Sequence, residues 1–81
     1  MNINTVYNKI IDKFRASNNL DVLVELENSD AGAATGSEAL MATGFYLVSL
    51  KNKNPVVYEL IKEQIREYLK YCKDYGLIIK Q

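Results

Sequence analysis

The sequence has no histidine, no tryptophan, one cysteine and one proline among its 81 residues. Without histidine, neither a Ser–His nor a Cys–His catalytic pair is possible. Zinc sites built from cysteine and histidine also lack their ligands. The single cysteine, Cys72, excludes an internal disulfide, which fits a reducing cytoplasmic setting. We therefore expect no catalytic residue, no metal ligand and no bound cofactor.

Long hydrophobic runs are also missing. The longest uncharged stretch extends from Ala39 to Leu50, well short of the roughly 20 apolar residues that span a bilayer. The first residues, MNINTVYNKIIDKF, carry charges within their apolar pattern and have no small-residue cleavage site, unlike a signal peptide. We expect a soluble cytoplasmic protein that has no membrane partner.

Positive charge is absent from the middle of the chain. Residues 16–50 contain no lysine or arginine. The net charge is +2 for residues 1–15, −5 for residues 16–50 and +3 for residues 51–81, so the chain is neutral (2 − 5 + 3 = 0). Ordinary solvated surface is the simpler interpretation of this acidic segment, and attraction of a basic partner is the other. In the last predicted helix acidic residues match the basic ones, so we expect no nucleic-acid partner. The acidic residues of the middle segment are Asp21, Glu25, Glu27, Asp30 and Glu38.

Hydrophobic periodicity predicts helices in the first third of the chain. Apolar residues recur every three or four positions from Thr5 to Ala16, with Asn4 or Thr5 as the N-cap. Residues 20–28 fit either a helix or an alternating strand. The only candidate partner strand is the tail at residues 77–80, and a lone two-stranded pair is weak, so we favour the helix.

Two further helices are predicted in the rest of the chain. Residues 36–52 form an apolar helix, and because its hydrophobic side chains point in nearly every direction it should lie at the centre of the fold. Residues 55–75 form a long last helix that starts at Asn54-Pro55 and ends at Gly76. The fold class is therefore all-α, a small three- to four-helix bundle that makes residues 1–81 a single domain.

Residues 27–38, ENSDAGAATGSE, have the spacing of an EF-hand calcium loop, with Glu27, Gly32 and Glu38 at positions 1, 6 and 12. Position 5 is Ala31, which offers no side-chain oxygen. The spacing of Thr35 and Glu38 is also that of a capping box, which accounts for the glutamate without a metal. We interpret this stretch as a connection between helices.

Two small residues inside predicted helices call for a packing explanation. Cys72 falls on the apolar face of the last helix, where a thiol is an inert core residue. Gly44 lies within the apolar helix, where glycine costs about 0.5–1 kcal/mol relative to alanine. We expect two backbones to approach closely at Gly44.

The strongest functional signal is a surplus of apolar surface. On a helical wheel the polar residues of the last helix cover less than half the circle, whereas one core contact needs a stripe of only ~100°. We therefore predict a non-enzymatic protein–protein interaction module that forms a homodimer through its third and fourth helices. The alternative is an immunity- or inhibitor-type protein that binds one basic target through the acidic middle segment. The predicted interface residues are Phe45, Val48, Val57, Leu60, Gln64 and Tyr71.

Overall fold

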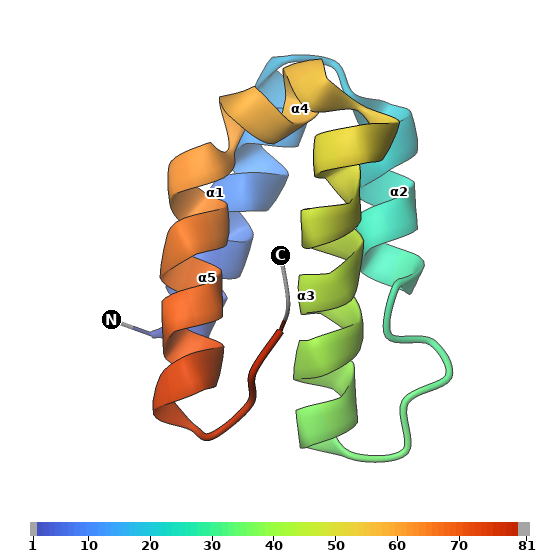
Figure 1. The fold of residues 1–81 in the computed structure, drawn as a ribbon. Helices are drawn as coiled ribbons and strands as arrows, with labels where there is room; N and C mark the ends of the chain where they lie inside the picture. The colour runs from blue at the N-terminus through green and yellow to red at the C-terminus, as the bar shows by residue number, and fades with distance from the viewer. Residues whose placement is uncertain (1, 80–81) are drawn as a thin grey trace.

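The computed structural model describes residues 2–79, which form five α-helices and, within that range, no β-strand. The helices pack as an antiparallel bundle in which α1 lies beside α5 and α2 beside α3, while the short α4 crosses the top (Figure 1). The chain after α5 returns between α5 and α3. The predicted all-α class is therefore confirmed. The helices are α1 (Ile3–Ala16), α2 (Leu20–Asn28), α3 (Gly36–Lys53), α4 (Pro55–Leu60) and α5 (Lys62–Asp74).

The first helix begins two residues earlier than the periodicity predicts. Asn2 is its N-cap, and the Asn2 side chain accepts a hydrogen bond from the Asn4 backbone N–H at 2.8 Å. The prediction that Asn4 or Thr5 caps this helix is wrong. The earlier start brings Ile3 into the helix, where it packs against the core.

The ambiguous residues 20–28 are helical, and α2 has the predicted bounds. The helix buries Val22, Leu23 and Leu26 and leaves Asp21 and Glu25 exposed. A strand would alternate its buried positions, whereas these three follow helical spacing. The strand alternative is therefore excluded.

The predicted last helix is divided in two. Asn54 caps α4 as expected, its side chain accepting a hydrogen bond from the Val57 N–H at 3.3 Å, and Pro55 begins the helix. At Ile61 the backbone leaves the helical region (φ −117°, ψ 16°), and α5 starts at the next residue. The turn changes the direction of the chain, so Val57 and Ile61 both face the core at 2% and 0% exposure.

The predicted stop at Gly76 is confirmed in detail. Gly76 has φ +79°, the left-handed region that glycine adopts without steric cost. The Leu77 N–H donates to the Cys72 carbonyl at 2.8 Å, and the Gly76 N–H donates to the Lys73 carbonyl at 2.9 Å. This pair of bonds is the Schellman motif, and it directs the following residues back toward α3.

The core lies between α1, α2, α3 and α5. Phe14, Ile10, Leu47, Ile61 and Cys72 are each fully buried there. The apolar helix α3 is covered by α2, α4 and α5, as its all-round hydrophobicity predicts. One side of α3 is not covered by another helix, and on that side Phe45 is 51% exposed.

Gly44 is explained by a side chain rather than by a neighbouring backbone. A β-carbon at this position would collide with Cδ1 of Ile79 and lie 3.4 Å from a ring carbon of Tyr68. The side chain of Ile79, which is 8% exposed, thus occupies the space that the glycine leaves and packs the C-terminal segment against α3. A close approach at Gly44 is therefore present, but the partner is the Ile79 side chain and not a second backbone, so that part of the prediction is wrong.

We expect Gly44→Ala to have opposite effects in two backgrounds. In the natural sequence it should displace Ile79 and lower stability by about 1 kcal/mol, because lost burial outweighs the gain in helix propensity. In an Ile79→Ala background the same change should raise stability by about 0.5–1 kcal/mol. Urea unfolding of the four proteins measures both effects. The same sign in both backgrounds would show that Ile79 does not restrict the space at Gly44, either because it is not in contact or because its side chain moves aside at little cost.

Candidate functional site

The connection between α2 and α3 is an ordinary helix cap. The Glu38 N–H donates to Thr35 Oγ1 at 3.1 Å, as the capping box predicts. The Glu38 carboxylate accepts from the Ala34 N–H at 2.9 Å, one residue before the expected donor. Across residues 2–79, no three Asp, Glu, Cys or His side chains gather as a metal site would require. None of the helices in that range is long and apolar enough to cross a membrane.

Replacing Thr35 by alanine should cost about 1 kcal/mol, since it removes the acceptor for the Glu38 N–H. Glu38→Gln should leave stability nearly unchanged, because the amide oxygen still accepts from Ala34. Thermal unfolding in calcium-free buffer and with added calcium measures both variants. A calcium-dependent stabilisation that disappears in Glu38→Gln would show that the stretch is a metal loop.

Cys72 belongs to the core, as the sequence predicts. Its side chain is fully buried, and burial raises the pKa of its thiol. The neutral thiol is favoured by this environment, whereas a nucleophile requires the thiolate. Cys72 therefore packs as a core residue.

The six predicted interface residues do not form one patch. Val57 and Gln64 are buried inside the chain, at 2% and 8% exposure, because the turn at Ile61 rotates α4 relative to α5. The Oε1 atom of Gln64 has no hydrogen-bond partner among residues 2–79. Leu60 is 37% exposed on α4. Tyr71 is partly exposed and stacks on Tyr75 with ring centroids 4.7 Å apart.

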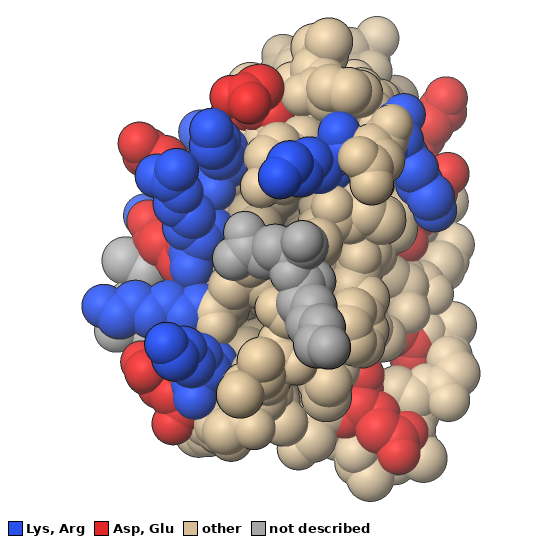
Figure 2. Space-filling view, viewed as in Figure 1, with Lys and Arg blue, Asp and Glu red and all other residues tan. Residues whose placement is uncertain are grey.

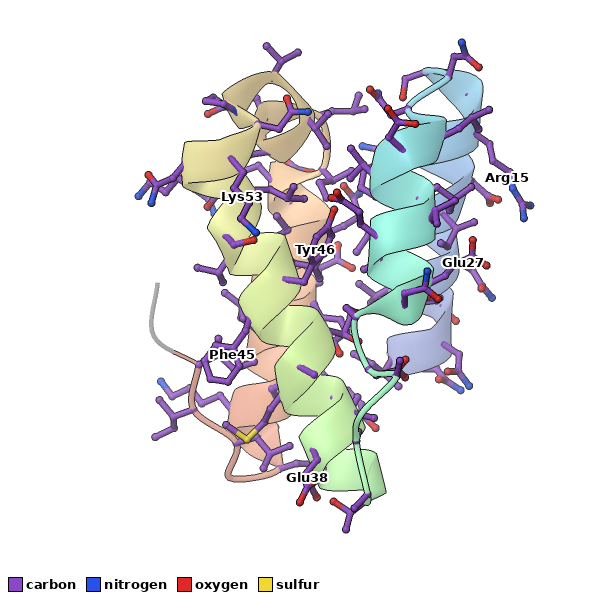
Figure 3. The ribbon with its side chains drawn as sticks, turned by 90° about the vertical axis from the view of Figure 1, so that its right-hand side faces the viewer. Arg15, Glu27, Glu38, Phe45, Tyr46 and Lys53 are labelled. Carbon is purple, nitrogen blue, oxygen red and sulfur yellow. The ribbon has the colours of Figure 1, made fainter. Side chains whose placement is uncertain are left out.

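The other two predicted residues, Phe45 and Val48, lie on α3. The Phe45 ring projects on the side of α3 along which the C-terminal segment runs (Figure 3). Val48 is partly buried against the core. Beyond Phe45 the exposed apolar surface continues on this segment, where Ile78 is 73% exposed.

A groove of 520 Å³ lies between this segment and α5. Leu69, Leu77 and Ile78 are among its apolar residues. Arg66, Lys70 and Lys73 line its α5 side. Figure 2 shows basic side chains gathered along α5, with uncharged surface over the lower part of α3 and further basic side chains over its upper end. This face, which we call the α3–α5 face, is thus apolar at its centre and basic along one edge.

A second cavity, of 490 Å³, lies near the N-terminal end of α3. Its residues come from α1, α3, α5 and the end of α2 with the following loop. Tyr68 and Thr43, at 2% and 6% exposure, are the most buried. Exposed Glu27 and Asp30 lie at its mouth. The remaining lining residues are Ile3, Asn4, Tyr7, Gly36, Ala39 and Leu40.

Hydrogen bonds hold the deep part of this cavity in place. The Tyr68 hydroxyl donates to the Leu40 carbonyl at 2.8 Å and so joins α5 to α3. The hydroxyl oxygens of Thr43 and Ser29 are 3.2 Å apart, which joins α3 to the end of α2. Because these polar groups already have partners, the floor offers mainly apolar surface to a ligand.

Glu27 and Asp30 bring negative charge to the cavity. Burial raises the pKa of Tyr7, and the nearby charges of Glu27 and Asp30 raise it further. Burial is also the main cause of the raised pKa of Tyr68, to which Asp30 contributes. Carboxylates that disfavour a phenolate favour a cation at the same place.

Sequence analysis missed this cavity because its residues are distant along the chain and form no local motif. The only relevant signal is the acidic segment without lysine or arginine, which supplies Glu27 and Asp30. The acidic segment indicates a concentration of negative charge, but it does not indicate a concave surface.

Comparison with protein-family models, with curated proteins and with solved structures found no match for this chain.

Proposed function

We propose that this protein is a non-enzymatic interaction module that self-associates through the α3–α5 face. The observation that carries this proposal is the half-exposed ring of Phe45 on the side of α3 along which the C-terminal segment runs, together with Ile78, which is 73% exposed on that segment. An aromatic side chain exposed beside other apolar residues is typical of an interface centre. A two-fold dimer would cover the same apolar centre on both copies.

The contacts of such a dimer come mainly from the apolar centre of the face, and salt does not screen apolar contacts. Added salt should therefore not weaken the dimer.

Replacing Phe45 by glutamate should produce monomers, because the substitution places a charge at the centre of the apolar surface. A matched control is Val56→Glu, which changes an 82% exposed residue on α4, outside the predicted interface. Sedimentation equilibrium measures the dissociation constant of each variant. An unchanged dissociation constant for Phe45→Glu, with intact helicity by circular dichroism, would show that the interface does not lie on the α3–α5 face.

The second candidate function is binding of one basic target protein through the acidic middle segment. The ion pair present within residues 2–79 joins Lys62 and Glu59, so no described lysine or arginine neutralises Asp21, Glu27 or Asp30 through a salt bridge. Association through these acids would weaken as salt increases, whereas the dimer should not weaken. The salt dependence of association therefore separates the two functions.

A further inference from the structure

The second cavity has the two properties of a small-ligand site. Its volume of 490 Å³ lies within the range that such sites occupy, roughly 300–1,000 Å³. Buried Tyr68 and Thr43 form its inner end together with Leu40, and their polar groups already form hydrogen bonds within the protein. Exposed polar residues form its mouth. A ligand that fits must be apolar at the inner end and polar at the outer end.

The charge of the outer end follows from the residues at the mouth. Glu27 and Asp30 are the charged residues that line the cavity, and none of its ten lining residues, all within residues 2–79, is lysine or arginine. An anionic headgroup would be repelled, and a neutral hydroxyl would gain only a hydrogen bond from a carboxylate. A cationic headgroup gains from both carboxylates while staying in contact with water, so it avoids the cost of burying a charge.

We propose that this cavity binds a small amphipathic amine, whose apolar group of several carbons fills the floor while its ammonium group stays at the mouth beside Glu27 and Asp30. The aromatic ring of Tyr7, also in the lining, offers a further favourable surface to a cation. This site goes beyond the proposed self-association, because its lining includes none of the predicted interface residues.

Three probes of equal chain length test the proposal: n-hexylammonium, 1-hexanol and hexanoate. Each is titrated at pH 7 into isotopically labelled protein, and amide chemical shifts are followed by two-dimensional NMR. Hexylammonium, which is protonated at this pH, should shift the amides of Tyr7, Leu40 and Thr43. It should bind about 3- to 10-fold more tightly than hexanol, as two exposed charge pairs allow. Hexanoate should bind most weakly.

Two variants distinguish the contribution of the mouth carboxylates to binding from the contribution of the cavity shape. The double substitution Glu27→Gln and Asp30→Asn should make hexylammonium and hexanol bind equally while leaving the hexanol affinity unchanged. Ala39→Leu, which fills part of the lining, should weaken all three probes without loss of helicity. Equal affinity of hexylammonium and hexanol for the unmutated protein would overturn the proposal, as would shifts confined to residues outside the cavity or no shifts. Because the shifts are read residue by residue, this result does not depend on whether the protein is a dimer.

Discussion

Phe14→Ala should lower the free energy of unfolding by about 3–5 kcal/mol, the cost of removing a buried phenylalanine ring and leaving a cavity. Phe14 is fully buried in the last turn of α1, just before the chain turns through Asn18 (φ 58°) into α2. A chain of 81 residues has about 4–12 kcal/mol of stability in total. The substitution should therefore remove a large part of the total stability at 25 °C.

Urea unfolding of dilute protein measures this loss. The matched control is Phe45→Ala, which removes the same atoms from a ring that is 51% exposed and should cost less than about 1 kcal/mol in the monomer. Similar losses at the two positions would contradict the burial of Phe14, and with it the packing of α1 in the core.

Raising the pH above 10 should destabilise the protein through two tyrosines. Burial raises the pKa of Tyr46, and so does the hydrogen bond that its hydroxyl donates to Glu25 at 2.7 Å. Burial likewise raises the pKa of Tyr68, whose hydroxyl donates to the Leu40 carbonyl. In the unfolded chain both titrate near pH 10. Above that pH the folded state keeps protons that the unfolded state has lost.

The sign of the effect follows from this difference in bound protons. The stabilisation is fully present below pH 10 and is lost as the pH rises from 10 toward the folded pKa values. Each tyrosine contributes a slope of up to about 1.4 kcal/mol per pH unit. Cys72, whose pKa is also raised by burial, acts in the same direction from about pH 9.

Unfolding free energies from pH 8 to pH 11.5 test the assignment. The double variant Tyr46→Phe and Tyr68→Phe should lose stability less steeply above pH 10, because two of the titrating groups are gone. If the slope is the same in the double variant and the natural sequence, these hydroxyls do not hold their protons in the fold.

The sequence predicted the features of the fold that local chemistry determines. Asn54-Pro55 and Gly76 specify helix ends through a side-chain acceptor, a fixed φ and a left-handed residue, and the structure has all three. The turn at Ile61 has no such signal. The apolar spacing continues through it without glycine or proline, so tertiary packing of Val57 and Ile61 decides it.

The surfaces were less predictable than the helices because they depend on how elements meet. A helical wheel treats residues 55–75 as one rod and so places Val57 and Gln64 on an exposed flank, whereas the turn at Ile61 turns both inward. The contact of Ile79 with Gly44 joins positions far apart in sequence, and so does the cavity between Tyr7 and Tyr68. Neither has a local pattern.

Light scattering of the unmutated protein over a range of concentrations tests the proposed self-association most directly. One chain has a mass of 9.2 kDa, so a dimer has 2 × 9.2 = 18.4 kDa. We expect a mass near 18.4 kDa at high concentration, falling toward 9.2 kDa on dilution, and we expect that added salt does not weaken the dimer. A mass of 9.2 kDa at every concentration and salt condition would contradict the dimer and leave the α3–α5 face available to a different partner.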